Sequence, residues 1–210
     1  TTFSFHPVKH ITTGEGGMVT TDNPDFAERM RIFRNHGITT DYHQREKHGT
    51  WFYEMVDLGY NYRITDIQCA LGLSQLRKLK VWVKRRQEIA RTYDAAFSEI
   101  PEVRPLMVRS DVSHAYHLYV VRFDLRRLKA TRAEIFAALR AEGIGVNVHY
   151  IPVHLHPFYR QMFGTRLGMC PVAEAAYEQI ISLPIFPHML DDDVNKVIAA
   201  VVKVIKVFST

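Results

Sequence analysis

The chain has 210 residues, of which 47% are hydrophobic, and its formal net charge is +5. A chain of this length and apolar content can bury a sizeable core, which excludes an intrinsically disordered protein. Acidic and basic residues are interspersed, and the main basic cluster, KVWVKRRQEIAR, falls in a helical pattern, so we predict no nucleic-acid partner.

The cysteines and the apolar runs indicate the setting in which the protein works. Cys69 and Cys170 lie far apart and have no metal-binding spacing, which favours a reduced, cytoplasmic setting over a disulfide scaffold. No apolar run is long enough to span a membrane and no signal-peptide pattern is present, so we predict no membrane association. The sequence starts without Met and inside a strand pattern, so we expect it to be part of a longer protein.

The opening stretch, TTFSFHPVKHITTGEGGMVTT, predicts two strands on either side of one lysine, Lys9. Residues 1–5 are β-branched and aromatic, and a glycine-dense turn leads into a second strand over 18–21. A lysine beside such a turn is usually just solvated. At the mouth of a rigid strand pair, however, its amine is partly desolvated and available to attack a carbonyl carbon. Ser4 can offer a hydroxyl to a phosphate, and the glycines let the backbone approach a flat cofactor.

A helix, a long loop and a second helical region are predicted next. NPDFAERMRIFRNHG has Asn23 as a cap and Gly37 as a stop, with apolar residues at helical spacing between them. TTDYHQREKHGTWFYEMVD shows no clear period, so we expect a long surface loop. Thr65 and Gln68 then form a capping box at the start of one long or kinked helix. Its apolar stripe consists of Ile67, Ala70, Leu71, Leu76, Leu79, Val83, Ile89, Tyr93 and Phe97.

A second unit is predicted to begin near residue 100, where Pro101 and Pro105 interrupt the helical run. In this unit AYHLYVVRFD and IGVNVHY are expected to be strands, and TRAEIFAALRAEG a helix with a capping box. PVAEAAYEQIISLP predicts a short helix, and DDDVNKVIAAVVKVIKVF a longer one whose positive N-terminal end carries three aspartates. Strands and helices therefore mix in α/β fashion.

Four motifs, in chain order, carry a resemblance to a known family: FSFHPVKHITTGEGGMV, LGYNYRITDIQCALGLSQL, GIGVNVHYIPVH and ISLPIFP. They resemble the DegT/DnrJ/EryC1/StrS family of sugar-nucleotide aminotransferases, which are fold type I enzymes that depend on pyridoxal 5'-phosphate (PLP). The resemblance is strongest to members that aminate UDP-4-keto-6-deoxy sugars on the way to pseudaminic acid.

The resemblance implies an α/β chain that is the C-terminal part of a fold type I PLP-dependent aminotransferase. Residues 1–100 are then the remainder of the large PLP-binding domain with its long connecting helix, and residues 101–210 a small C-terminal α/β domain. The family's N-terminal half, which this sequence lacks, normally supplies the aspartate that pairs with the pyridine nitrogen and the aromatic ring that stacks on the cofactor.

The resemblance also implies roles for individual residues. Lys9 matches the Schiff-base lysine, which then shuttles a proton, and Ser4 matches a hydroxyl on the cofactor phosphate. Asn61 matches an asparagine that reaches the same phosphate from the neighbouring subunit, which implies a homodimer with shared active sites. Arg63 matches a position close to the substrate. On the segment that borders the family's sugar-nucleotide pocket lie His149, Tyr150 and His154.

Asn61 and the histidines are also compatible with roles outside a cofactor site. Asn61, which precedes a helix, is equally typical of a turn. His149, His154 and His156 suggest zinc, but their spacing matches no familiar structural zinc pattern and no cysteine is near them in sequence. We therefore favour pocket polarity or surface histidines and predict no metal.

Three functions follow from these patterns. The first is a PLP-dependent aminotransferase that moves an amino group from L-glutamate to a nucleotide-linked keto sugar, for cell-surface polysaccharide or glycan biosynthesis. The second is a deoxysugar dehydratase of the same fold, and because dehydratases carry histidine at the lysine position, Lys9 favours transfer. The third is a non-catalytic fragment or a regulatory relative. We expect residues 1–210 alone to bind PLP weakly and not to transaminate.

Overall fold

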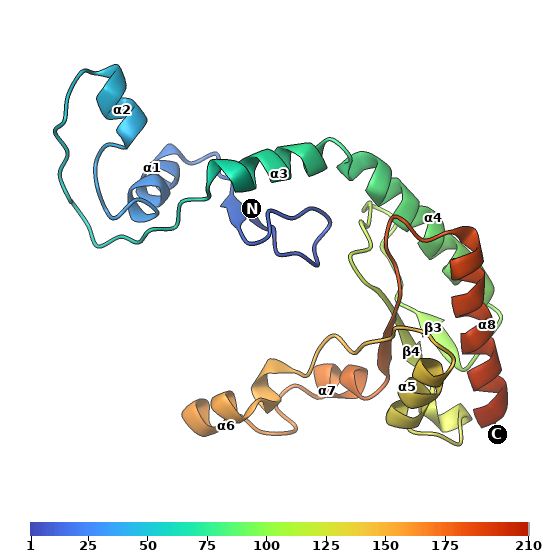
Figure 1. Ribbon diagram of the computed structural model, residues 1–210. Helices are drawn as coiled ribbons and strands as arrows, with labels where there is room; N and C mark the ends of the chain where they lie inside the picture. The colour runs from blue at the N-terminus through green and yellow to red at the C-terminus, as the bar shows by residue number, and fades with distance from the viewer. Residues whose placement is uncertain (210) are drawn as a thin grey trace. The chain divides into compact units, whose positions relative to one another are not determined.

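A computed structural model describes residues 1–209 and divides the chain into two compact units, Thr1–Leu79 and Lys80–Thr210 (Figure 1). The first unit contains β1 (Thr2–Ser4), β2 (Gly17–Val19), α1 (Pro24–Phe33), α2 (Tyr42–Lys47) and α3 (Asp66–Leu76). The second contains α4 (Leu79–Phe97), β3 (Val103–Pro105), β4 (Tyr119–Phe123), η1 (Leu125–Arg127), α5 (Arg132–Ala141), η2 (Val153–Leu155), α6 (Pro157–Phe163), α7 (Pro171–Tyr177), β5 (Ile180–Leu183) and α8 (Asp191–Phe208).

The first unit begins with an antiparallel hairpin. β1 pairs with β2 so that Thr2 lies opposite Val19 and Ser4 opposite Gly17. The two predicted strands are confirmed, but both are shorter than the sequence pattern. The first strand ends early because the carbonyl of Phe5 accepts bonds from the Thr12 hydroxyl and the Thr13 N–H, which divert the chain into a closed loop.

The helices of the first unit begin at local caps. The side chain of Asn23 accepts the N–H of Phe26 at 3.0 Å, which starts α1 where the sequence predicts it. The expectation of an unbroken loop after α1 is wrong, because α2 forms within it. Asp41 and Gln44 make a reciprocal capping box, and such a cap can start one helical turn without any apolar period.

The predicted long helix is two helices, α3 and α4, separated by Arg77 and Lys78. The capping box of Thr65 and Gln68 starts α3 as predicted. The apolar stripe is buried in α4, as at Tyr93, but in α3 Ile67 remains 84% exposed.

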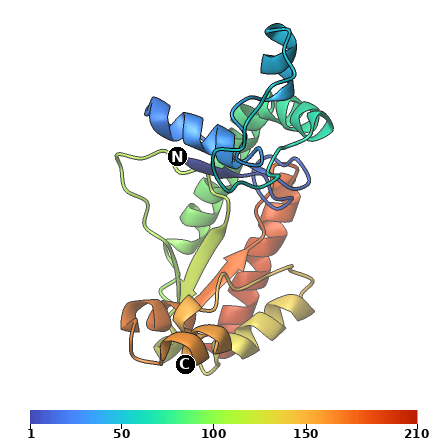
Figure 2. The ribbon, with the colours of Figure 1, turned by 90° about the vertical axis from the view of Figure 1, so that its left-hand side faces the viewer.

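The second unit is built on an antiparallel sheet with the order β3-β4-β5. Buried side chains from its strands join those of α4, α5 and α8 in one core. Figures 1 and 2 show α4 and α8 side by side against the sheet. The largest fully buried side chains are Tyr93, Phe97, Phe123, Ile89, Ile135, Leu139, Ile181, Val103, Val121 and Val201. α4 contributes to this core, and the division between the two compact units falls at its first residue, Leu79. The predicted boundary near residue 100 follows the end of the helix.

One predicted strand of the second unit is not continuous. Residues 144–150 pair with the sheet only at a single bridge, Asn147 opposite Ser182, instead of along a full strand. The backbone N–H groups of these two residues bond each other's carbonyls at 3.2 and 2.7 Å. The apolar alternation of this segment is satisfied differently, since Ile144 and Val146 are buried in the core without a ladder.

Candidate active site

Lys9 lies in a closed loop that follows β1. Its side chain is half-buried, and its backbone N–H donates to the carbonyl of His6 at 3.0 Å. The loop closes where the carbonyl of Phe5 accepts both the N–H of Thr13 at 3.1 Å and the hydroxyl of Thr12 at 2.8 Å. The lysine backbone is therefore fixed by bonds at both ends of a short segment.

Two glutamines of α3 hold this loop from outside. Oε1 of Gln75 accepts the N–H of Thr12 at 3.0 Å, and Nε2 of Gln68 donates to the carbonyl of Glu15 at 2.9 Å. Sequence reasoning missed both contacts, because it assigned Gln68 only to the capping box and gave Gln75 no role. The bonds join α3 to the end of the Lys9 loop at Thr12 and to the glycine turn at Glu15.

Two glycines make room for Thr13, which is only 4% exposed. A Cβ on Gly72 would lie 2.9 Å from the methyl group of Thr13, and a Cβ on Gly16 would lie 2.5 Å from its hydroxyl. The hydroxyl itself donates to the carbonyl of Glu15 at 2.6 Å. A glycine inside an apolar helix pattern is the signal that could have revealed this close approach.

The other predicted residues of the first unit occupy two places. Ser4 ends β1, and its exposed hydroxyl oxygen accepts a long 3.4 Å contact from the N–H of His6. Asn61 and Arg63 lie on a separate segment, where Asn61 forms an isolated bridge with Asn35 and Nη1 of Arg63 donates to Oδ1 of Asn35 at 2.8 Å. Ser4 thus lies at the end of the strand that leads into the Lys9 loop, while Asn61 and Arg63 both contact Asn35.

His149 and Tyr150 lie in the second unit. Nδ1 of His149 lies 2.8 Å from the hydroxyl of Ser182, which is itself 5% exposed on β5. Burial lowers the pKa of His149, which favours a neutral ring in the hydrogen bond with the hydroxyl. The ring of Tyr150 meets the His149 ring edge to face at 4.6 Å and stays 66% exposed.

His154 takes part in a clasp. Its Nε2 lies 2.7 Å from Oε1 of Glu174, and the same carboxylate accepts the N–H groups of Gly168 at 2.9 Å and Cys170 at 3.2 Å. Burial acts to raise the pKa of Glu174, and the bonds from His154 and the two N–H groups outweigh it, so the net shift is downward. The ring of His154 therefore ties η2 to α7, and the carboxylate of Glu174 also holds the loop that precedes α7.

Residues 1–209 contain neither a cluster of metal ligands nor a membrane-spanning helix. In that part of the chain no three His, Cys, Asp or Glu side chains gather closely enough to hold a metal ion. None of the helices described there has the length and apolar character needed to cross a bilayer.

Comparison with known proteins gives a consistent result. The sequence profile described as the DegT/DnrJ/EryC1/StrS aminotransferase family matches residues 1–202. The spore coat polysaccharide biosynthesis protein SpsC of Bacillus subtilis is 43% identical over 208 residues, which are 98% of this chain and 54% of SpsC. The chain spans about half the length of the curated relatives it matches.

Solved structures share the fold. Helicobacter pylori PseC, an aminotransferase involved in the biosynthesis of pseudoaminic acid, superposes with a TM-score of 0.87 at 34% identity, over 99% of this chain and 53% of PseC. Spr1654 of Streptococcus pneumoniae, named as a sugar aminotransferase and solved in its PLP-form, gives a TM-score of 0.83 at 31% identity, over 98% of this chain and 51% of Spr1654. The predicted α/β fold and the predicted family resemblance are confirmed.

Proposed function

Because the chain belongs to the DegT/DnrJ/EryC1/StrS aminotransferase family, we propose that it carries the lysine-bearing part of a PLP-dependent sugar aminotransferase. In this proposal the amino group passes from L-glutamate to a nucleotide-linked keto sugar of the UDP-4-keto-6-deoxy type, for polysaccharide or glycan biosynthesis in the cytoplasm. The supporting observation is the anchored loop that carries Lys9, closed at Phe5 and held by Gln75.

The residues of the first unit fit PLP by the chemistry of their donors. The half-buried amine of Lys9 suits the aldehyde of PLP, and the hydroxyl of Ser4 suits its phosphate. The hairpin beside them bears no side chain at Gly16 or Gly17, and a Cβ on Gly17 would lie 2.9 Å from the carbonyl of Phe3. When bound, PLP supplies an electron sink for the carbanion at the substrate carbon.

The chain's own residues then divide the work. Nζ of Lys9 takes and returns the proton, because the closed loop keeps its backbone in one place relative to the hairpin. Ser4 can donate its hydroxyl proton to a phosphate oxygen, since that hydroxyl accepts a long contact from His6. Arg63 offers its remaining guanidinium donors to an anionic part of the substrate while Asn35 holds Nη1. His149 and Tyr150 line the sugar-nucleotide side, and His154 shapes that segment through Glu174.

Chemical trapping tests the central residue. The purified chain is incubated with PLP, reduced with borohydride and digested, and the modified lysine is located by mass spectrometry. We expect the label on Lys9 in preference to exposed lysines such as Lys47 and Lys129, because only Lys9 is half-buried in an anchored loop. The Lys9→Arg chain should lose that label and keep its circular dichroism spectrum. Label spread evenly over the lysines would contradict the assignment.

We also propose that the active form is a homodimer in which Asn61 serves the phosphate of its partner's site. An Asn61→Ala chain and a Lys9→Ala chain each lack one required residue at every site. In mixed dimers one of the two sites regains both, so trapping on Lys9 of the Asn61→Ala chain should rise toward half occupancy. If mixed dimers form, as sedimentation can verify, and trapping does not rise, Asn61 acts in its own subunit or not at all.

A further inference from the structure

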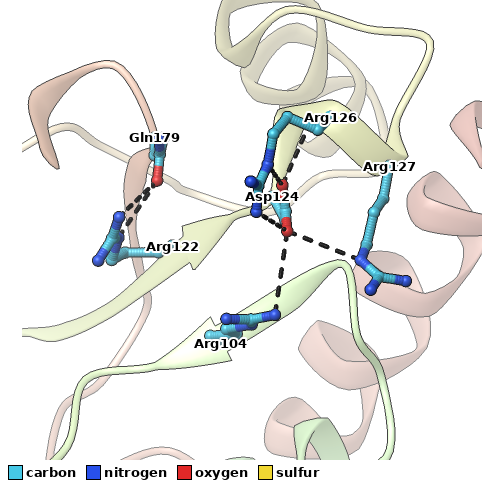
Figure 3. Close-up of polar contacts among 6 residues, drawn as sticks. All are labelled: Arg104, Arg122, Asp124, Arg126, Arg127 and Gln179. Carbon is cyan, nitrogen blue, oxygen red and sulfur yellow. Dashed lines mark hydrogen bonds and ion pairs between the residues drawn. The ribbon is translucent and has the colours of Figure 1, made fainter. Parts of the chain in front are cut away.

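A second polar cluster lies in the second unit, where β3 begins and β4 ends beside η1. It borders a pocket of about 550 Å³, a volume within the range of small-molecule sites. No residue predicted for the active site lines this pocket. Figure 3 shows the side chains involved: Arg104, Arg122, Asp124, Arg126, Arg127 and Gln179.

The strand register forces two arginines together. Arg104 on β3 lies directly opposite Arg122 on β4, so their side chains leave the same face of the sheet. Like charges directly opposite each other destabilise an antiparallel pair. An anion between or beside the two guanidinium groups would relieve this cost.

The negative charge of Asp124 is already taken up by one arginine of the cluster. The carboxylate of Asp124 accepts two hydrogen bonds of 2.9 Å from Nε and Nη2 of Arg126. Nε of Arg127 lies 3.6 Å and Nη2 of Arg104 lies 3.9 Å from Oδ2 of the same carboxylate. The bonds from Arg126, more than the other arginines, hold the pKa of Asp124 at about 2. Asp124 is thus a fixed anion already paired by Arg126, and Arg104 reaches it only at 3.9 Å.

Arg122 has only a neutral partner. Its Nε and Nη2 both donate to Oε1 of Gln179, at 3.3 and 2.7 Å. Among residues 1–209 no carboxylate lies within ion-pair distance of Arg122. The edge of its guanidinium that normally pairs with an anion is therefore held in place by an amide (Figure 3).

We propose that this pocket binds the phosphate group of a small phosphorylated molecule, held by Arg104 and Arg122. The two arginines carry two positive charges, which a doubly charged phosphate matches better than a single carboxylate does. The guanidinium N–H groups that Gln179 and Asp124 do not engage can donate to the phosphate oxygens. Leu106 and Met107, which are 50% and 95% exposed, form an apolar wall of the same pocket and offer room for the remainder of the molecule. Free phosphate and a nucleotide share this chemistry.

Titration with four probes tests the site and separates these two sources. Inorganic phosphate, pyrophosphate, AMP and adenosine are added to the isotopically labelled chain, and shifts are followed by NMR. We expect phosphate, pyrophosphate and AMP to shift the signals of Arg104, Arg122 and Gln179, and adenosine to leave them unchanged. AMP binding more tightly than phosphate, with a shift at Met107, identifies a nucleotide, whereas equal affinity identifies the free anion.

Single substitutions test which arginines bind the phosphate. Arg104→Gln and Arg122→Gln should each weaken phosphate binding by about tenfold, because each removes a charge-assisted pair of bonds. Arg109→Gln is the control, since Arg109 is exposed and pairs with Asp111 outside the pocket. Arg104→Gln should not lower the thermal midpoint at low salt, because it removes a like-charge contact, yet it should reduce the rise in midpoint caused by phosphate.

Two results would overturn the proposal. One is the absence of shifts at the three signals at millimolar phosphate. The other is an equal loss of binding in Arg109→Gln, which would show a diffuse attraction between a basic surface and anions. Neither result bears on Lys9, because PLP trapping is measured on the other unit of the chain.

Discussion

At the scale of single residues, one of the few buried residues of the first unit closes the Lys9 loop. Within the described residues 1–79 only Thr13 and Gly37 are buried. Thr13 bonds Phe5 through its N–H and Glu15 through its hydroxyl, and it packs on Gly72 of α3. The position of the Lys9 loop therefore depends on one small polar side chain seated against a glycine, and not on an apolar core.

Replacing Gly72 by alanine tests whether the contact between Thr13 and Gly72 positions the loop. In a helix interior alanine is favoured over glycine by about 0.5–1 kcal/mol, so α3 alone should gain stability. The new methyl group would lie 2.9 Å from the methyl of Thr13 and push the loop away. We expect faster amide exchange over residues 5–13, measured by hydrogen-deuterium exchange and mass spectrometry.

The companion change is Thr13→Ser, which removes the opposing methyl and keeps the hydroxyl. In that background Gly72→Ala should no longer speed exchange in the loop. Ser74→Ala, an exposed substitution on the same helix, serves as control. Equal exchange in Gly72→Ala and in the original chain would show that the contact does not position the loop.

Some of these residues could be found from the sequence and others could not. Lys9 and Ser4 stand out because a strand and a glycine turn bracket them locally. The bonds of Gln75 to Thr12 and of Gln68 to Glu15 join positions 63 and 53 residues apart. Periodicity carries no information at such separations, so only the fold reveals that α3 supports the loop.

At the scale of elements, local signals predicted the helix starts well. The boxes at Thr65 and Thr131 are formed as expected, because a cap needs only residues three positions apart. Strand pairing was predicted less well. Residues 144–150 alternate like a strand, yet they pair with β5 at one bridge only. Strand pairing needs a partner strand as well as an alternating segment, and the sequence of the segment does not show how far a partner runs beside it.

Arg86 joins three elements of the second unit. Only 6% of it is exposed, and its Nη1 donates to the carbonyls of Tyr116, His117 and Ile185 at 3.0, 3.3 and 2.8 Å. Burial lowers its pKa. The guanidinium thus fixes α4 to the segment before β4 and to the segment after β5.

We predict that Arg86→Met lowers the free energy of unfolding by at least about 1–3 kcal/mol, since buried carbonyls lose their donor while the apolar stem is kept. The loss for Arg86→Lys should lie between zero and the loss for Arg86→Met, because an ammonium group keeps the charge but lacks the planar guanidinium that donates to several carbonyls. Urea denaturation measures both, with the exposed Lys84→Met as control. A change within about 0.5 kcal/mol for Arg86→Met would contradict the prediction.

At the scale of the whole molecule, the apolar core lies entirely in the second unit. Every residue of the core cluster falls between Ile89 and Ile205. In the first unit, large apolar side chains such as Trp51 at 84% and Phe3 at 48% exposure remain uncovered within the described chain. The sequence predicted apolar stripes on both sides of residue 79 equally, because a stripe records which face can be buried and not what buries it.

This distribution predicts two levels of protection. Amides of α4 beyond Arg86, of β4 and of α8 should exchange only by unfolding of the core, whereas amides of β1, β2 and α3 should exchange far faster through local opening. Replacing Leu139 by alanine tests whether the two units are stabilised separately. Because Leu139 is fully buried, Leu139→Ala should lower the free energy of unfolding of the second unit by about 2–5 kcal/mol. Because Leu139 belongs to the second unit's own core, exchange in α3 should not change with it. Hydrogen-deuterium exchange is measured on the original chain and on Leu139→Ala. Equal protection of α3 and α8 in the original chain, or a loss of α3 protection in Leu139→Ala, would mean that the first unit draws its stability from the same core.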